Sequence, residues 1–167
     1  TISKHSYVKV GKKSVTSLAS GIKILGKKLL INTFDCKELI CDGVFSEESK
    51  FEIGDHIYMQ KRIYLGDGVP KAYMELYFSL ALLPDIKEKQ YHQMPYHDIV
   101  GFEDLYKAPT YRRLKASKFS DQVNLYLDQN KQNHGFFTEE YFFNADQKVL
   151  LYAKVYFSLN YDIKLVG

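Results

Sequence analysis

A short turn between two strand-like runs constrains the fold of this chain more than any other feature. Residues 56–65 and 71–83 are rich in β-branched, aromatic and aliphatic side chains, and Gly66-Asp67-Gly68 lies between them. A turn of this kind between strand-forming residues is the sequence signature of a β-hairpin. Gly66 and Gly68 can adopt the positive φ that a tight turn requires. The sequence therefore predicts a fold built on antiparallel strands.

A second copy of this hairpin follows later in the chain. Residues 141–159 align with residues 62–80 without a gap, and the shift is the same at each match (146 − 67 = 79 and 156 − 77 = 79). The segment Tyr77-Phe78-Ser79-Leu80 recurs as Tyr156-Phe157-Ser158-Leu159. Two copies are too few for a solenoid, which needs about three repeats. We predict two similar hairpins, side by side or related by a pseudo-twofold axis.

The composition is that of one globular domain with modest charge. The chain has 167 residues, of which 46% are hydrophobic and 26% charged, and these values are close to the average for globular proteins. Its net charge is +3, and its lysines are scattered, whereas a domain that binds nucleic acid itself has a clustered basic face. DNA is therefore not the expected partner of these residues.

The remaining elements follow from hydrophobic periodicity and capping signals. Helices are expected at 14–25, where Ser14 or Ser17 can cap the start, and at 120–129, where Ser120 or Asp121 can do so. Further expected elements are strands at 29–36, 111–119, 136–143 and 148–159, a helical turn at 46–50, a loop or short helix at 82–96, and a weak helix at 98–106. This order predicts an α+β fold, with an antiparallel β-sheet and flanking helices. Residues 1–13 are expected to be a lead-in or linker, and residues 14–167 one domain.

Cysteine, histidine and hydropathy patterns limit which disulfide or metal sites the chain can have and where in the cell it is expected. The spacing of Cys36 and Cys41 matches no disulfide framework, which favours a reduced, intracellular protein. The five histidines lack the i, i+4 spacing of a helical zinc site, so we expect no metal. No signal peptide and no apolar run of about 18 residues occurs, so the expected location is the cytoplasm. The chain begins at Thr1 without Met and is expected to be part of a longer protein.

The sequence contains no recognisable catalytic motif. The nucleophile-elbow pattern Gly-x-Ser-x-Gly and the phosphate-loop pattern Gly-x-x-x-x-Gly-Lys-Ser/Thr are both absent, although each would be visible from sequence alone. The acidic pairs Glu47-Glu48 and Glu139-Glu140 are predicted to lie on solvated faces. Nothing in these patterns requires an enzyme.

Two features could bind a small ligand. Arg62 and Tyr64 are two residues apart in a predicted strand and therefore share one face. Arg62 could be a salt-bridged structural residue or a clamp for an anion. The predicted helix start at Ser17-Leu18 could bind an anion through its free N–H groups, or Ser17 could be a plain helix cap.

Several short motifs also follow one another in a fixed order. Ser17-Leu18 begins a helix with Gly26 nine positions after the serine, and the closing hairpin carries an Ala-Asp-Gln-Lys turn before Val149. Between them come Gly54-Asp55, Arg62, Gly68-Val69-Pro70, Tyr77 and Pro84. Together these motifs resemble the UTRA domain, the effector-binding domain of HutC-subfamily GntR-family bacterial transcriptional regulators. The resemblance runs from about residue 17 to about residue 160, apart from residues 87–111.

The resemblance implies a chorismate-lyase-like α+β fold and a role in transcription regulation. It implies an effector-binding and dimerisation domain that forms a homodimer and needs no cofactor. It also implies a separate N-terminal winged helix-turn-helix domain, absent from this chain, that binds operator DNA. Many members of the family bind a sugar phosphate or another small anion. The expected protein is thus a regulator, in particular a repressor, and not an enzyme.

The resemblance further implies which positions line the effector site. They are Ser17, Leu18, Arg62, Tyr64, Met74, Leu151 and Phe157. Tyr64 stands where the family has a second arginine, and Met74 stands where it has a glutamate, with Glu75 on the opposite face. Leu151 replaces a carboxylate and Phe157 a tyrosine. We therefore hypothesise a site that keeps an anion grip but is more apolar than a typical sugar-phosphate site.

Two other interpretations of the sequence stay open. The chain could be an enzyme of chorismate-lyase-like fold, because fold alone does not separate enzymes from sensors. It could also be a domain that has lost its ligand and serves only for dimerisation, as the apolar residues Met74 and Leu151 suggest.

Overall fold

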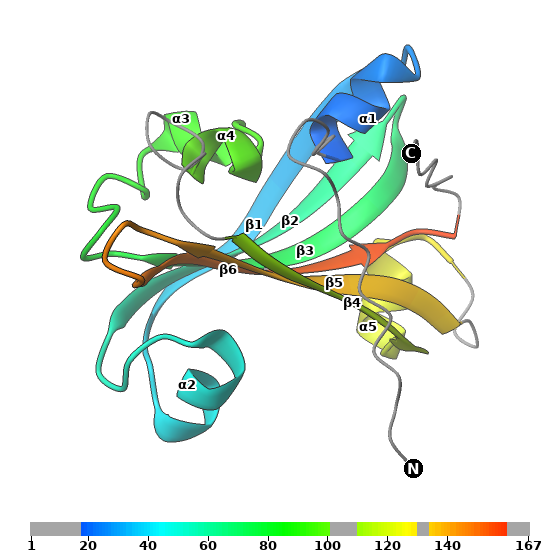
Figure 1. Cartoon of the computed structure of the whole chain (residues 1–167). Helices are drawn as coiled ribbons and strands as arrows, with labels where there is room; N and C mark the ends of the chain where they lie inside the picture. Colours follow the sequence, from blue (N-terminus) through cyan, green and yellow to red (C-terminus); the bar gives the residue numbers. More distant parts are fainter. Residues whose placement is uncertain (1–17, 101–109, 130–133, 160–167) are drawn as a thin grey trace.

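The computed structural model describes residues 18–100, 110–129 and 134–159, which form a six-stranded antiparallel sheet with short helices on both faces (Figure 1). The strand order is β1-β2-β3-β6-β5-β4. The strands are β1 (Leu29–Ile40), β2 (His56–Gly66), β3 (Val69–Ser79), β4 (Thr110–Lys118), β5 (His134–Phe143) and β6 (Val149–Phe157). The helices are α1 (Leu18–Ile24), α2 (Gly43–Ser49), α3 (Lys89–His92), α4 (Tyr96–Val100) and α5 (Asp121–Tyr126). The predicted α+β class is confirmed.

The two hairpins are related by a pseudo-twofold axis between β3 and β6. Each half of the sheet runs strand, helix, strand, strand, as β1–α2–β2–β3 and β4–α5–β5–β6. At the centre, Tyr73 pairs with Tyr156, which is the equivalent of Tyr77 under the shift of 79 residues. Glu75 pairs with its own equivalent, Lys154 (75 + 79 = 154). A twofold axis through this last pair explains both observations, so the sequence repeat corresponds to a symmetry of the fold.

The first hairpin turn has positive φ at Asp67 and Gly68, and not at Gly66 as the sequence suggested. These φ angles are 50° and 77°, as in a two-residue turn of type I′. Gly66 instead ends β2, and a Cβ on it would lie 3.2 Å from Ile22 of α1. The Asp67 carboxylate accepts a hydrogen bond from the backbone N of Lys28 at 2.8 Å. Gly66 is therefore needed for the close approach of α1, and the turn is tied to the start of β1.

Strand β1 is longer than predicted, because it continues beyond residue 36 to Ile40. Its pairing with β2 shifts register between Phe34 and Lys37, and Asp35 there has a φ of 48°. A bulge of this kind inserts an extra residue and bends the strand without ending it. Hydropathy alone could not distinguish this bulge from the end of a strand.

The helices only partly match their predicted ranges, and α2 and α5 begin at side-chain caps. Helix α5 is capped by Ser120, whose hydroxyl accepts from the backbone N of Val123 at 3.3 Å, which decides between the two predicted caps. Helix α4 begins at Tyr96, two residues before the predicted helix at 98–106. Residues 101–106 of that predicted helix lie outside the described residues.

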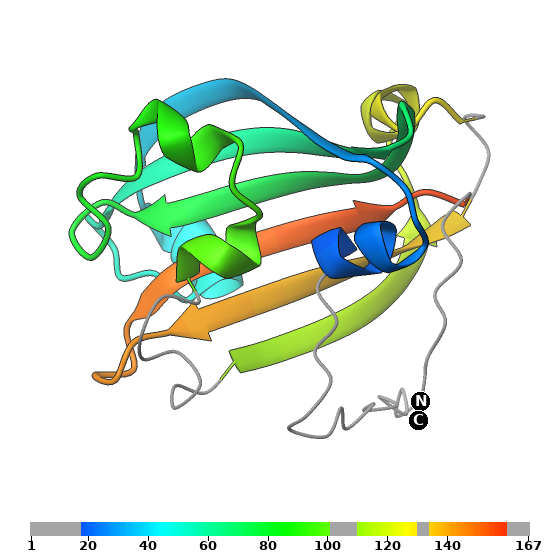
Figure 2. The same ribbon diagram turned by 90° about the horizontal axis from the view of Figure 1, so that it is seen from above.

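The helices lie on two sides of the sheet, which we call the upper and lower faces. Helices α1, α3 and α4 cover the upper face, and α2 and α5 cover the lower face (Figures 1 and 2). Because side chains alternate along a strand, Gln60, Arg62 and Tyr64 of β2 point to the upper face, and Ile57 and Ile63 to the lower. The largest apolar cluster lies between the upper face and helices α1 and α4.

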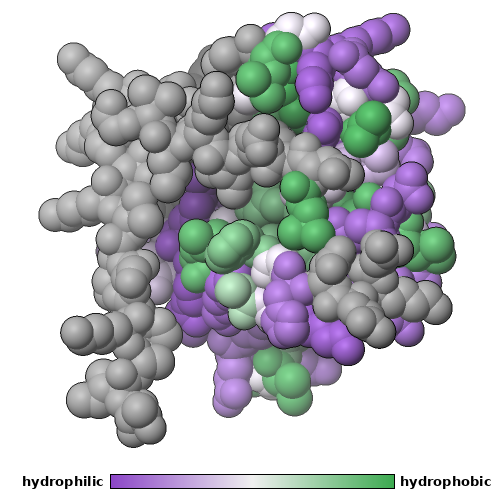
Figure 3. Space-filling model, turned by 90° about the vertical axis from the view of Figure 1, so that its right-hand side faces the viewer, coloured by the Kyte–Doolittle hydropathy of each residue, from purple (hydrophilic) through white to green (hydrophobic). Residues whose placement is uncertain are grey.

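Apolar side chains also reach the surface, but in separate places. On the side of the molecule in Figure 3, apolar patches are divided by hydrophilic side chains. Both cysteines are unpaired, with Cys36 exposed and Cys41 buried. Within the described ranges, no helix is long and apolar enough to cross a membrane.

Alanine at Gly135 is expected to destabilise the second half of the sheet. A Cβ there would lie 2.6 Å from two ring carbons of Phe119, which is buried in the cluster beneath α5. Because that ring would have to move within a packed cluster, we expect a loss of about 1–3 kcal/mol in the free energy of unfolding. Gly43→Ala is the matched control, since its nearest neighbour is Ile53 at 4.0 Å and alanine favours a helix. Urea unfolding tests the pair, and a Gly135→Ala variant as stable as wild type would contradict the close approach.

Candidate functional site

Arg62 of β2 is a buried cation on the upper face of the sheet. It has 0% exposed surface. Its Nε donates to Oε1 of Gln60 at 2.9 Å, Nη1 to the carbonyl O of Met94 at 2.5 Å, and Nη2 to the carbonyl O of Tyr91 at 2.7 Å. None of the ion pairs formed by the described residues includes Arg62. Burial lowers the pKa of this guanidinium, because neutral acceptors compensate only in part for the loss of water around a charge.

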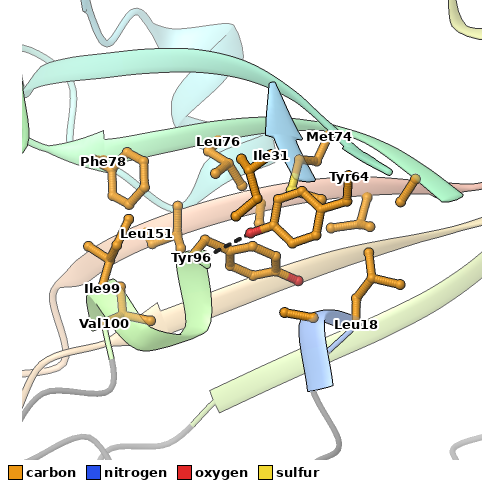
Figure 4. Packing of buried hydrophobic residues seen from close by; sticks show 14 of the residues in the cluster. Leu18, Ile31, Tyr64, Met74, Leu76, Phe78, Tyr96, Ile99, Val100 and Leu151 are labelled. Carbon is orange, nitrogen blue, oxygen red and sulfur yellow. Dashed lines mark hydrogen bonds between the residues drawn. The ribbon is translucent and has the colours of Figure 1, made fainter. Parts of the chain in front are cut away.

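The two carbonyl partners of Arg62 belong to one stretch of chain, residues 91–97, which we call the α3–α4 segment. The carbonyl O of His92 accepts from Oγ1 of Thr33 on β1 at 2.7 Å. At the start of α4, the backbone N of Tyr96 donates to the Tyr64 hydroxyl at 2.9 Å (dashed line in Figure 4). Burial raises the pKa of Tyr64 to about 12, so its hydroxyl stays protonated. The α3–α4 segment is thus held on the upper face largely through its backbone.

A buried carboxylate holds the other end of the α3–α4 segment. Glu140 of β5 is 2% exposed. Its carboxylate accepts from the Tyr96 hydroxyl at 3.0 Å and lies 3.0 Å from Nε of Arg112 and 3.5 Å from Nε2 of His97. Burial acts to raise the pKa of Glu140, but the hydrogen bond from His97 and the charge of Arg112 outweigh it and lower the pKa to about 2. Glu140 therefore stays ionised and connects α4 to β4 and β5.

The prediction that Glu139-Glu140 is solvated is wrong. Glu139 is 5% exposed on the lower face, where its carboxylate accepts from the hydroxyls of Tyr141 at 3.2 Å and Tyr152 at 3.0 Å and pairs with Lys115. The reason is that β5 is covered on both faces, so adjacent glutamates each point into a covered side of the sheet. A period-two pattern of strand burial cannot reveal this from the sequence.

The structure brings six of the seven predicted site residues together on the upper face. Leu18, Tyr64, Met74 and Leu151 are buried there (Figure 4). Arg62 is buried on the same face, and Phe157 packs against the apolar cluster partly buried. Ser17 lies outside the described residues. That these residues bind an effector stays a prediction.

The expected pocket at these positions is filled. Met74 and Leu151 are both 0% exposed and form an apolar floor with Ala72 and Ala153. The ring of Tyr96 covers this part of the face, with its centroid 6.3 Å from that of Tyr64 (Figure 4). In this conformation the α3–α4 segment occupies the space that a ligand of Arg62 would need.

A basic groove of about 420 Å³ opens beside the α3–α4 segment. It is lined by Lys23, Lys27, Lys28, Leu29, Leu30, Ile31, Gln93 and Pro95. Two of its lining residues, Gln93 and Pro95, belong to the α3–α4 segment. Three lysines at such an opening attract anions from solution. No group of three or more His, Cys, Asp or Glu side chains within the described ranges could hold a metal ion.

Sequence reasoning missed Gln60, Thr33 and the whole α3–α4 segment. Gln60 could have been found, because it lies two residues before Arg62 and so shares its strand face. Thr33 is paired with Arg62 across β1 and β2, a register that the sequence does not contain. The α3–α4 segment resembles a polar loop in sequence, and only its position over the sheet reveals its contacts.

Comparison with known proteins gives one family. The family model of the UTRA domain matches residues 26–161. A sequence comparison with curated proteins finds no match. Among solved structures, the effector domain of PhnF from Mycobacterium smegmatis aligns with a TM-score of 0.73 and 13% identity, over 90% of this chain and 91% of that one. The present chain spans 66% of the longer solved PhnF chain.

Two further solved structures are similar in fold. The C-terminal domain of the histidine utilization repressor from Pseudomonas syringae pv. tomato str. DC3000 aligns with a TM-score of 0.69 and 10% identity, over 84% of this chain and 97% of that one. A GntR-family transcriptional regulator from Enterococcus faecalis V583 aligns with a TM-score of 0.68 and 12% identity, over 82% and 99%. These likenesses confirm the chorismate-lyase-like α+β fold. The chain therefore belongs to the UTRA domain family, the effector-sensing domains of GntR-family transcription regulators.

Proposed function

We propose that this domain senses a small anionic metabolite, such as a sugar phosphate, through Arg62 on the upper face of its sheet. Binding would release the α3–α4 segment and change how a separate winged-helix domain of the same protein engages operator DNA in the cytoplasm. Two copies of the domain would pair, so that effector binding alters the spacing of two DNA-binding heads relative to two half-sites. We further propose that the protein is a repressor.

The observation that carries this proposal is the unbalanced charge of Arg62. A buried cation is costly unless it is paired with an anion, and the acceptors of Arg62 among the described residues are neutral. The planar fork of an arginine matches two oxygens of a carboxylate or phosphate. An anionic effector would supply the missing negative charge.

The position of the basic groove supports the same proposal. Lys23, Lys27 and Lys28 line an opening that is bordered by Gln93 and Pro95 of the α3–α4 segment. An anion attracted there would meet the segment that covers Arg62. The groove is open, whereas the face around Arg62 is closed, so entry requires movement of the segment.

Thermal unfolding in the presence of candidate ligands tests the proposal. A panel of sugar phosphates, phosphorylated disaccharides and neutral sugars would be followed with a dye, because the chain has no Trp. A ligand at about 100 times its Kd adds roughly 2.7 kcal/mol, which raises Tm by several degrees in a domain of this size. We expect shifts from phosphorylated compounds only, and at least about tenfold weaker binding in Arg62→Lys, which keeps the charge but loses the fork.

Lys61→Ala is the matched control for this experiment. Lys61 precedes Arg62 on β2 but pairs with Asp35 at 3.2 Å and is partly exposed, so its loss should leave the ligand response unchanged. Each variant is compared with its own Tm without ligand, which separates binding from stability. Equal responses in wild type and Arg62→Lys would rule out Arg62 as the anion-binding residue.

One observation favours a second candidate function. The apolar floor under Tyr96 is fully buried, as in a domain that no longer binds a ligand and serves only for dimerisation. In that case no compound shifts Tm, and the isolated domain still pairs in sedimentation or scattering measurements.

A further inference from the structure

Four side-chain donors gather on the upper face around Arg62. Two are Nη1 and Nη2 of Arg62, and a third is Oγ1 of Thr33, which lies directly opposite Arg62 in the pairing of β1 with β2. The fourth is Nε2 of Gln60, one position along the same face of β2. Such a concentration of donors is unusual for a face that is otherwise apolar.

Three of these donors are used by consecutive parts of the α3–α4 segment. The carbonyl oxygens of Tyr91 and Met94 accept from Arg62, and that of His92 accepts from Thr33 at 2.7 Å. The His92 and Met94 carbonyls lie at and just beyond the end of α3, where carbonyls lack the partners of a continuing helix. The Tyr91 carbonyl also accepts from the backbone N of Gln93 and of Met94. Three oxygens, each with a partial negative charge, thus cover the donors as the oxygens of one anion would.

The fourth donor has no partner. Gln60 is 0% exposed, and its Nε2 is the buried side-chain polar atom without a hydrogen-bond partner in the described part of the chain. Its orientation is fixed, because Oε1 accepts from Nε of Arg62. The Tyr58 hydroxyl lies near this amide, which acts against the rise that burial causes in the pKa of Tyr58, but the contact of the hydroxyl with Nε2 does not have the geometry of a hydrogen bond. An unsatisfied buried donor costs about 1–3 kcal/mol and is rare in folded proteins. The α3–α4 segment therefore satisfies three of the four donors and leaves one without an acceptor.

The number and kind of donors indicate the shape of a complete occupant. A planar carboxylate offers two oxygens whose acceptor sites all lie in one plane, and the fork of Arg62 would take one site on each oxygen. A tetrahedral phosphate or sulfate offers at least three oxygens in different directions, and a full negative charge for the buried guanidinium. The donor set therefore favours a tetrahedral oxyanion.

We propose that residues 91–94 are an internal ligand mimic, and that Gln60 and Thr33 join Arg62 in binding the tetrahedral oxyanion that displaces them. This inference rests on the proposed anion-sensing function and names the binding residues and ligand class of that site. The unliganded state is then closed by the protein's own carbonyls, and the effector competes with them. Tyr96 holds the segment in place through Glu140 and Tyr64, so it controls how readily the site opens.

Inorganic phosphate, with acetate as the planar comparison, tests this assignment in the intact domain. Affinity would be measured by calorimetry up to 50 mM ligand for wild type, Gln60→Leu, Thr33→Val and Tyr96→Phe. We expect phosphate to bind more tightly than acetate, and Gln60→Leu and Thr33→Val each to bind phosphate about fivefold to tenfold more weakly, as the loss of a hydrogen bond to a charged group implies. Tyr96→Phe should bind phosphate several-fold more tightly, because less of the protein is in the closed state.

Hydrogen exchange of residues 89–100 supplies the second readout. Phosphate should speed exchange in this segment, since a bound oxyanion and the docked carbonyls exclude each other. If Gln60→Leu, Thr33→Val and Tyr96→Phe bind phosphate with the affinity of wild type but Arg62→Lys does not bind it, the ligand mimic is wrong and the proposed function still stands. Binding that is insensitive to Arg62 as well, or absent from every protein at 50 mM, would overturn both. Slower exchange in the segment would also count against the mimic.

Discussion

Replacing Glu140 with alanine is expected to lower the free energy of unfolding by about 3–5 kcal/mol, the usual cost of removing one partner of a buried ion pair. The Glu140 carboxylate receives the Tyr96 hydroxyl and lies beside Arg112 and His97. Its loss leaves the Tyr96 hydroxyl, which is buried, without an acceptor. Urea unfolding would measure this loss. Arg112 is 35% exposed, so water screens part of its attraction to Glu140, and we expect a loss near the lower end of this range.

The same carboxylate makes stability depend on pH in a defined window. The pKa of Glu140 is about 2, below its ordinary value of 4.5. A lowered folded-state pKa means that its contribution is complete above about pH 4.5 and is lost as the pH falls towards 2. The wild type should therefore lose more stability across this window than Glu140→Gln does.

Glu47→Ala is the control for the effect of Glu140. Glu47 is an exposed glutamate on α2, and its removal should change the free energy of unfolding by less than about 0.5 kcal/mol. If Glu140→Ala were no less stable than Glu47→Ala, the carboxylate would not hold the α3–α4 segment. In that case the role given to Tyr96 in closing the site would also fall.

The second large effect is expected from a glutamate at Leu151, one of the positions where the family resemblance implies a carboxylate. Leu151 is 0% exposed and lies between Phe78 and Phe142 in the sheet. Both of these strand neighbours are apolar, so a carboxylate there must be buried unpaired or become protonated with a raised pKa. We expect Leu151→Glu to cost more than about 4 kcal/mol in the free energy of unfolding and to leave the domain largely unfolded at 37 °C.

Met74→Glu is the matched comparison, and it should be tolerated better. Met74 is also 0% exposed, but it lies directly opposite Arg62 in the pairing of β2 with β3. A glutamate there can pair with the guanidinium, so we expect it to cost at least about 2 kcal/mol less than Leu151→Glu. It should also abolish phosphate binding, because the new carboxylate supplies the counter-charge internally. If the two variants lose the same free energy of unfolding in urea at pH 7, the charge of Arg62 is already compensated in the wild type.

These two variants bear on how the site differs from that expected of the family. The apolar residues at 74 and 151 are part of a packed floor beneath Tyr96, so they remove acceptors that sugar hydroxyls would use. The polar groups around the floor include the donors near Arg62, the carboxylate of Glu140 and the Thr138 hydroxyl that donates to it. We therefore expect the domain to recognise the effector mainly through the effector's anionic group.

Local sequence determined the framework of this domain. The Asp67-Gly68 turn and the alternating runs on each side define a hairpin, and the identical shift of 79 residues defines its copy. Both depend on backbone conformation and strand periodicity, which are properties of neighbouring residues. The same periodicity placed Arg62 and Tyr64 on one face and Glu75 on the other, as the structure has them.

Tertiary structure decided what those side chains contact. Thr33 meets Arg62 through the register of two strands, and the carbonyls of Tyr91 and Met94 meet it because the α3–α4 segment folds back over the sheet. Glu140 is buried because β5 is covered on both faces. Each of these contacts joins residues far apart in the chain through backbone groups or packing, and neither leaves a pattern in the sequence. The sequence alone thus determines that a cation faces the site, and only the tertiary structure determines that the protein's own carbonyls occupy it.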